Sequence, residues 1–262
     1  MSDNGNLHSA VGLPPAPYYN GRFSNGPVAV EQLAAQLVAP LFDFAWGGAT
    51  TGVGNGGDAG TQTSLGLLHL PGMLTELATS TVPPGLAPSS LFVVWGGAND
   101  FEAGGSVTTA ISDIDAIVAS LQASGATHIL VPGLPDLGLT PEFYGDPAAT
   151  LFSQQFNQGL QSTLPSDVIY SDVFGLLNSV TQNPGAYGFT NVTEPCFNGF
   201  TVCSNPGQYL FWDDLHPTTA ADAILARQFQ SDVAPIPEPS SFLLLASGIT
   251  GLVAVLRSRR EA

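Results

Sequence analysis

The chain has 262 residues, of which 44% are hydrophobic and 9% aromatic, which is enough to bury the core of one globular domain. It carries 21 acidic residues against five basic ones, for a net charge of −16. This excess of negative charge repels phosphate backbones and argues against a nucleic-acid partner.

Short apolar runs alternate with helical stretches along the first 234 residues. The apolar runs predict buried strands at residues 41–46, 90–96, 128–133 and 168–173. Helices are expected near residues 30–38, 63–79, 108–123, 148–164 and 218–231. Strands that alternate with helices predict an α/β fold with a parallel sheet covered on both faces. We expect residues 1–234 to form this domain.

Two positions that come after predicted strands are candidates for oxyanion binding. Gly48 follows the strand at 41–46, and a glycine there lets a substrate approach the backbone N–H. Asn99 follows the strand at 90–96, and its amide can donate to a developing oxyanion. Loops at the carboxyl ends of parallel strands are where such sheets place ligands. Taken singly, each residue is explained as well by an ordinary strand-to-loop turn.

An aspartate and a histidine separated by two residues precede an expected helix start. Asp213 can hold the imidazole of His216 in one tautomer, and the imidazole can take the proton of a nucleophilic serine. Pro217 and the two threonines after it are typical of a helix start, so the pair is expected on a loop just before a helix. Asp214 is the alternative partner of the histidine, and a simple surface turn is the alternative to a catalytic pair.

Cys196 and Cys203 enclose six residues, among which Asn198 and Gly199 can turn the chain back. This spacing predicts a disulfide worth about 2–3 kcal/mol on the loop-closure model, and with it an oxidising compartment. A metal site is the weaker alternative, because no further cysteine or clustered histidine completes it. The glycine-rich run at 52–57 matches a dinucleotide fingerprint, but no helix start comes after it, so no cofactor is expected.

The carboxyl-terminal segment differs from the rest of the chain. A stiff, proline-rich linker at 235–239 leads into an uncharged apolar stretch at about 240–256, and a cluster of arginines closes it. The stretch predicts a short membrane span with its basic flank in the cytoplasm, and a buried core helix is the alternative.

The order of Pro237-Glu238-Pro239, an apolar span and an arginine cluster resembles the PEP-CTERM sorting signal of exported bacterial proteins. The resemblance implies recognition by an exosortase. It also implies anchoring in the inner membrane before sorting to the cell surface or the extracellular matrix.

Three blocks occur in the order found in the GDSL (SGNH) hydrolase family, which the chain resembles. They are FAWGGAT at 44–50, GAND at 97–100 and FWDDLHP at 211–217, and the GRFSNGP segment at 21–27 resembles the lipase/esterase branch. The resemblance implies a three-layer α/β/α sandwich with a parallel, flavodoxin-like sheet. It also implies an ester hydrolase without metal or cofactor, with Gly48 and Asn99 as oxyanion donors, His216 as general base and Asp213 as its orienter.

The first block of that family is Gly-Asp-Ser-Leu, in which the serine is the nucleophile. Residues 2–6, SDNGN, resemble the continuation of this block, so the nucleophile is expected immediately before Met1. Ser2 lies two positions late, which displaces a side chain by several ångströms, and we do not expect it to replace the nucleophile. The chain is therefore expected to lack the first, central strand and a signal peptide.

The sequence predicts an exported, membrane- or surface-associated ester hydrolase. Lipid, aryl and acetylated-carbohydrate esters all remain open as substrates, the last in an extracellular matrix. The alternative is a non-catalytic envelope or matrix scaffold derived from a hydrolase. Because such a scaffold is expected to lose Asn99, Asp213 or His216, the presence of all three favours the enzyme.

Overall fold

The computed structural model describes residues 2–80 and 85–234. Its main sheet consists of the parallel strands β1 (Leu91–Val93), β2 (His128–Pro132) and β3 (Ile169–Ser171), in the order β1-β2-β3. Leu91 pairs with His128 and Leu130 with Ile169, so the register is continuous across the three strands. The α/β class and the parallel sheet predicted from the sequence are confirmed.

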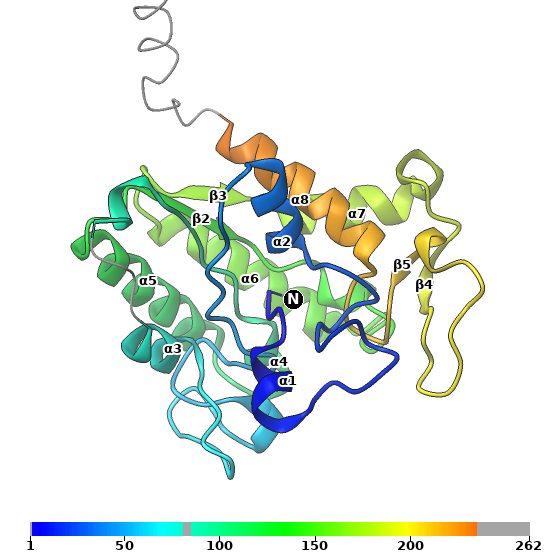
Figure 1. The fold of residues 1–262 in the computed structure, drawn as a ribbon, viewed down its shortest axis with the longest axis horizontal. Helices are drawn as coiled ribbons and strands as arrows, with labels where there is room; N and C mark the ends of the chain where they lie inside the picture. Colours follow the sequence, from blue (N-terminus) through cyan, green and yellow to red (C-terminus); the bar gives the residue numbers. More distant parts are fainter. Residues whose placement is uncertain (1, 81–84, 235–262) are drawn as a thin grey trace, which may run out of the picture. The chain divides into compact units, whose positions relative to one another are not determined.

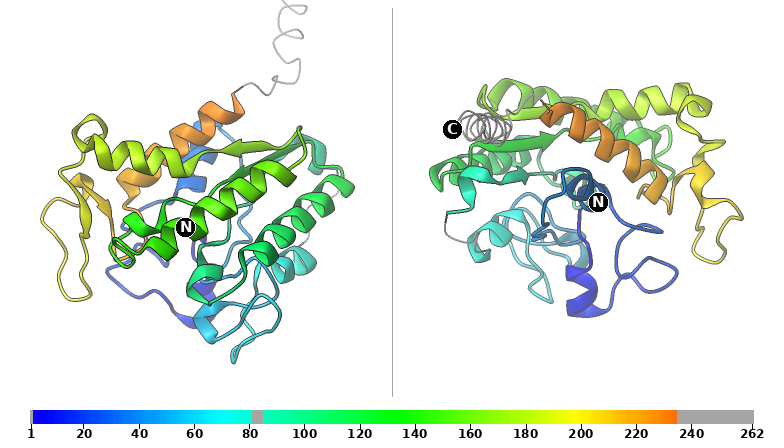
Figure 2. Two further views of the ribbon diagram at one scale, coloured as in Figure 1. Left: turned by 180° about the vertical axis from the view of Figure 1, so that it is seen from behind. Right: turned by 45° about the horizontal axis from the view of Figure 1, so that its top comes forward.

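Helices cover both faces of this sheet. Figures 1 and 2 show α5 and α6 on one face and α2 and α8 on the other. The helices of the described residues are α1 (Asn6–Val11), α2 (Ala29–Gln36), α3 (Met73–Thr79), α4 (Ala98–Glu102), α5 (Val107–Ala123), α6 (Pro147–Thr163), α7 (Val173–Gln182) and α8 (Thr219–Val233). Ile114 of α5, Phe156 of α6 and Val131 of β2 are fully buried in the core between α5, α6 and the sheet.

A second, smaller sheet holds the loop with the two cysteines. Its strands β4 (Asn191–Pro195) and β5 (Tyr209–Phe211) run parallel, and β5 leads into the loop with Asp213 and His216. Cys196 and Cys203 are joined by a disulfide with Cα atoms 4.8 Å apart. The sequence analysis did not predict β4, β5, α1 or α4, which are short. It also missed α7, although the buried residues Val173, Leu177 and Val180 of this helix recur at helical spacing.

The predicted strand at 41–46 is wrong. In the described part of the chain the segment pairs with no strand, and its backbone instead bonds to side chains. The Trp46 N–H donates to Glu76, and the Asn6 amide donates to the carbonyls of Asp43 and Ala45. An apolar run becomes a strand only where a neighbour completes its ladder.

The predicted helix at 63–79 is shorter than expected. Only α3 forms, because Gly66, Pro71 and Gly72 break the helical pattern ahead of it. A Cβ at Gly66 would overlap Asp58, and one at Gly72 would overlap the backbone carbonyls of Gly52 and Gly54. These close approaches explain why the chain between residues 50 and 72 is an irregular, tightly packed loop.

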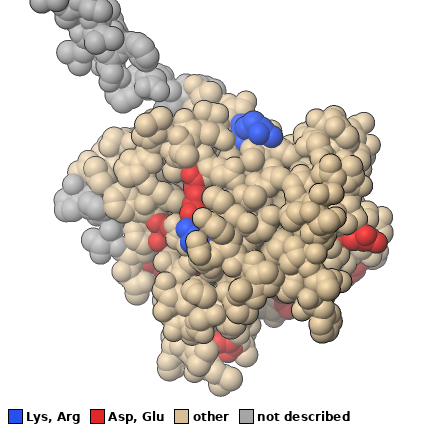
Figure 3. All heavy atoms as spheres, turned by 45° about the vertical axis from the view of Figure 1, so that its right-hand side comes forward, with Lys and Arg blue, Asp and Glu red and all other residues tan. Residues whose placement is uncertain are grey.

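The sorting residues Pro237, Glu238 and Pro239 and the expected span at 240–256 lie outside the described residues, so the structure does not bear on them. Within residues 2–80 and 85–234, no helix is both long and apolar enough to cross a membrane. Charged side chains are sparse on the face drawn in Figure 3, as expected from a sequence with 10% charged residues.

Candidate active site

Asp213 and His216 meet on the loop between β5 and α8. The His216 Nδ1 lies 2.9 Å from Asp213 Oδ2, and Oδ1 accepts the backbone N–H groups of Leu215 at 2.9 Å and His216 at 2.6 Å. Burial opposes ionisation of Asp213, but the His216 ring and these donors outweigh it and lower the pKa of the carboxyl to about 2. The carboxylate therefore orients the ring through Nδ1, which leaves Nε2 for chemistry. Asp214 makes no hydrogen bond to His216 in the described part of the chain.

Two aromatic residues that the sequence did not single out support this pair. The Tyr18 hydroxyl donates to Asp213 Oδ2 at 2.8 Å, and Phe23 stacks on the His216 ring with centroids 4.7 Å apart. Burial and the neighbouring Asp213 charge raise the pKa of Tyr18, so it stays a donor. Phe23 belongs to the GRFSNGP segment, which resembles the lipase/esterase branch of the family. That resemblance was the signal in the sequence that could have pointed to Phe23.

Hydrogen bonds between distant parts of the chain fix the start of α8, just after His216. The Ser24 hydroxyl donates to the Pro217 carbonyl at 2.9 Å, and its oxygen lies within hydrogen-bond distance of Asp222 Oδ2, at 3.2 Å. Asp222 is fully buried, and burial raises the pKa of its carboxyl. Its other oxygen accepts the N–H of Ala29, the first residue of α2. The GRFSNGP segment thus ties α2 to α8 and holds the histidine loop between them.

Gly48 lies in a loop that requires glycine. Its φ is +82°, and a Cβ there would overlap Asn55 Oδ1. Asn55 is fully buried and donates to the Gly47 carbonyl at 2.8 Å, while the Gly56 N–H donates to the Gly48 carbonyl at 2.8 Å. Among the described residues, the Gly48 N–H has no hydrogen-bond acceptor. A rigid loop therefore presents a free backbone donor.

Asn99 lies in the first turn of α4, which is joined to β1 by residues 94–97. Its amide donates to the Ala49 carbonyl at 2.7 Å, which leaves the second amide hydrogen for a ligand. The neighbouring Asp100 is fully buried and accepts from Thr51 Oγ1 and from Gln62, both at 2.7 Å. These bonds join the loop of Asn99 to that of Gly48, so the two donors are held together.

The sequence-predicted residues meet along one cleft of about 570 Å³. Gly48, Asn99 and His216 all line it, as does Ser2, while Asp213 lies behind His216. The volume is within the usual range for small-molecule sites. Glu76 also lines the cleft, and burial raises the pKa of its carboxyl to about 8. The sequence offered no signal for Glu76, because its burial arises only when α3 packs against the segment 41–46.

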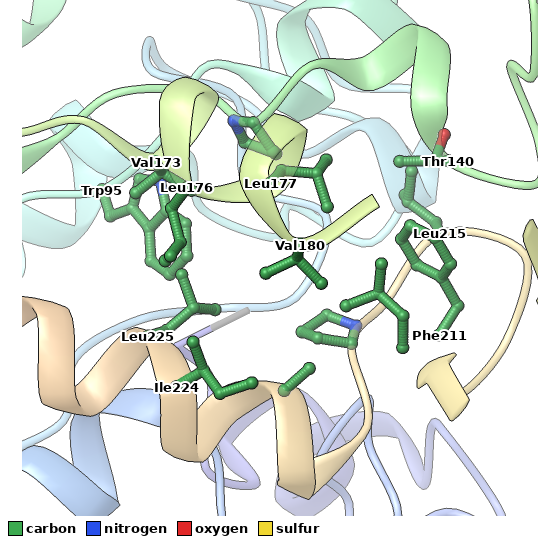
Figure 4. Close-up of a pocket in the computed structure, with 14 residues that line it drawn as sticks. Trp95, Thr140, Val173, Leu176, Leu177, Val180, Phe211, Leu215, Ile224 and Leu225 are labelled. Atoms are coloured by element: carbon green, nitrogen blue, oxygen red, sulfur yellow. The ribbon is translucent and has the colours of Figure 1, made fainter. Parts of the chain in front are cut away.

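A smaller cavity of about 60 Å³ lies behind the histidine loop, between α7 and α8 (Figure 4). Its walls include Val180, Ile224 and Leu215, and they are almost entirely carbon. The space is less than half of the roughly 150 Å³ that admits benzene into an apolar cavity. It is therefore a packing space of the core and offers no room for an acyl chain.

A parallel α/β sheet with an Asp–His pair and two candidate oxyanion donors at one cleft is typical of hydrolases that use a side-chain nucleophile. The chain belongs to the GDSL-like lipase/acylhydrolase family, which residues 2–229 match. By this family resemblance the protein is a hydrolase of ester bonds.

Relatives in plants and bacteria share this domain. A GDSL esterase/lipase of Arabidopsis thaliana is 26% identical over 273 residues, covering 79% of this chain and 76% of the relative. The thermolabile hemolysin of Vibrio parahaemolyticus is 26% identical over 267 residues, covering 87% of this chain and 60% of the hemolysin. An uncharacterised protein of Pseudomonas putida is 33% identical over 164 residues, which are 53% of this chain and 28% of that protein. This chain thus spans less than two thirds of the two bacterial relatives.

Residues 235–260 match the PEP-CTERM protein-sorting motif. The match confirms the resemblance seen in the proline-flanked glutamate, the apolar stretch and the arginine cluster. It supports export of the protein to the cell envelope.

Proposed function

We propose that the protein hydrolyses carboxylic esters by acyl transfer through a serine placed immediately before Met1. His216 Nε2 takes the proton of the serine hydroxyl, whose oxygen attacks the ester carbonyl. The Gly48 N–H and the Asn99 amide donate to the resulting oxyanion. The alcohol leaves with the proton from His216, and water then repeats the cycle and releases the acid.

The observation that carries this proposal is the cleft, which His216, Gly48 and Asn99 line together. Asp213 occupies Nδ1 of the base, and the Gly48 N–H has no other acceptor among residues 2–80 and 85–234. These are the groups that acyl transfer needs besides a nucleophile. They are held by hydrogen bonds from loops far apart in the sequence.

The substrate we propose is an uncharged ester. The apolar walls of the cleft include Leu33, Phe44 and Leu77, which suit an apolar acyl or aryl group. Asp43 lies in the same walls, and burial raises the pKa of its carboxyl to about 6, so above that pH its negative charge disfavours anionic substrates. Because a PEP-CTERM motif supports export, the ester is expected in the envelope or outside the cell, and the sorting residues Pro237, Glu238 and Pro239 are expected to be recognised by an exosortase.

The test uses the chain with eight residues added before Met1, Val-Ile-Val-Val-Phe-Gly-Asp-Ser, which we call the serine-extended chain. Hydrolysis of 4-nitrophenyl acetate and butyrate is measured. The matched control ends in Gly-Asp-Ala and is called the alanine-extended chain. We expect turnover only with the serine. Equal rates for the two chains would contradict the proposal and favour a non-catalytic scaffold.

A further inference from the structure

The loop that the disulfide closes directs one side chain toward the protein. Of the six residues between Cys196 and Cys203, residues 198–202 are exposed and Phe197 alone is partly buried. The chain turns back at Gly199, whose φ of +85° favours glycine, and the Cys203 N–H donates to the Cys196 carbonyl at 2.7 Å. The turn and the disulfide therefore fix the backbone that carries the Phe197 ring.

The Phe197 ring belongs to an aromatic cluster beside the histidine loop. It stacks on Trp212 with ring centroids 5.7 Å apart and an interplanar angle of 25°. Tyr18 packs edge-to-face against Phe197 at 5.7 Å and against Trp212 at 6.2 Å. Trp212 is fully buried, whereas residues 15–17 and 19–20 on either side of Tyr18 are exposed. Rings from a distant part of the chain therefore fix the position of Tyr18.

This cluster reaches both members of the Asp213–His216 pair. The Tyr18 hydroxyl donates to Asp213 Oδ2 at 2.8 Å. The Phe197 N–H donates to the Trp212 carbonyl at 2.6 Å, and the Trp212 N–H donates to the His216 carbonyl at 2.7 Å. Contacts thus run without a break from the disulfide loop through Phe197 to the carboxylate and to the histidine backbone.

We infer that Phe197 is a positioning residue for the Asp213–His216 pair and that the disulfide holds it in place. The ring acts through Tyr18, whose hydroxyl it keeps against the carboxylate. Loss of the ring lets Tyr18 move and water reach the carboxylate, so that Nδ1 of the histidine is held less firmly. The inference rests on the proposed function, in which the histidine is the general base.

The first experiment observes the pair directly in the 262-residue chain. NMR spectroscopy measures how fast the Nδ1 proton of His216, identified by its loss in His216→Ala, exchanges with water. Phe197→Ala is expected to speed this exchange about two- to tenfold, as the loss of aromatic contacts implies. Phe197→Tyr keeps the ring and should retain the parent rate. Phe200→Ala is the matched control, because Phe200 lies in the same loop and is 94% exposed.

The same variants distinguish positioning from a purely structural role. The midpoint of thermal unfolding is measured for each of them. If Phe197→Ala lowered the midpoint but exchanged its Nδ1 proton as slowly as Phe200→Ala, the side chain would only stabilise the fold, and the inference would be overturned.

A double-mutant cycle tests whether the disulfide acts through Phe197. Replacing Cys196 and Cys203 together by alanine is expected to speed the exchange by the same factor as Phe197→Ala, and combining the changes should add nothing further. Effects that multiplied would contradict the role given to the disulfide. The Phe197 variants keep the disulfide, so they test the inference even if the cysteine-free protein does not fold.

Turnover separates this inference from the proposed function. In the serine-extended chain, Phe197→Ala is expected to lower kcat about two- to tenfold at unchanged KM, because Phe197 does not line the cleft. If that chain hydrolysed no ester while Phe197→Ala still sped the proton exchange, the proposed function would fail and the positioning role would stand. Turnover that Phe197→Ala left unchanged would overturn the inference alone.

Discussion

The two sides of the cleft differ in how far contacts within the described chain hold their residues in place. On the histidine side, Asp213, Tyr18 and Phe23 hold the ring of His216 through hydrogen bonds and stacking. On the β1 side, the outer edge of β1 and the segment 39–47 pair with no strand within the described residues. The comparison teaches that loop contacts alone can position the base and the oxyanion donors. They do so although the neighbouring edge of the sheet, at β1, is unpaired within the described residues.

The largest expected effect concerns the histidine side. His216→Ala in the serine-extended chain is expected to lower kcat by about 10⁶-fold, because the serine loses the base that takes its proton. Hydrolysis of 4-nitrophenyl butyrate measures it, with His69→Ala as the matched control on a histidine that does not line the cleft. If the His216→Ala protein retained the parent rate, His216 would not be the catalytic base.

Asn99→Ala should cost less. One of two oxyanion donors is lost while the Gly48 N–H remains, so kcat of the serine-extended chain is expected to fall by about 10²–10³-fold. The substitution also removes the bond to the Ala49 carbonyl, so the unfolding midpoint must be measured in parallel. Unchanged kcat in a protein of unchanged stability would show that Asn99 only joins the two loops.

Tyr18→Phe tests how the pair on the histidine side is held. Loss of one hydrogen bond to the Asp213 carboxylate is expected to lower kcat roughly tenfold with KM little changed. Tyr19→Phe is the matched control, because Tyr19 is 43% exposed and stacks only against Arg22 among the described residues. Equal kinetics of the two variants would mean that Asp213 orients His216 without help from Tyr18.

The smallest effect is expected on the β1 side of the cleft, from Glu76→Gln. Burial raises the pKa of Glu76 from 4.5 to about 8, so between these pH values the folded protein keeps a proton that the unfolded chain has lost. Stability attributable to this group is therefore present at low pH and lost as the pH rises through about 8.

Glu76→Gln removes this dependence. Its unfolding midpoint should equal that of the parent near pH 4.5 and exceed it by about 2–5 °C near pH 8. Glu194→Gln, on an exposed glutamate, is the control. A difference from the parent that does not change with pH would mean that Glu76 is not buried in its protonated form.

The residue types of the site could be read from the sequence because their chemistry is local. Asp213 and His216 are three positions apart and meet within one turn, and Gly48 and Asn99 lie just after apolar runs. Three of the four predicted strands and the long helices α5, α6 and α8 are also predicted by hydrophobic pattern, which acts over a few turns. The roles assigned to these residues remain predictions until the kinetics are measured.

The rest depends on contacts that no local pattern contains. Tyr18 reaches Asp213 across 195 positions, and Ser24 reaches Asp222 across 198. The segment 41–46 has the sequence of a strand yet forms none, because a ladder requires a neighbour and β1 pairs only with β2 among the described strands. The sequence by itself therefore determined the chemical groups and the α/β class. Tertiary structure decided which groups meet and which strand edge stays open, because hydrogen bonds between distant segments and strand pairing form only when the whole sheet assembles.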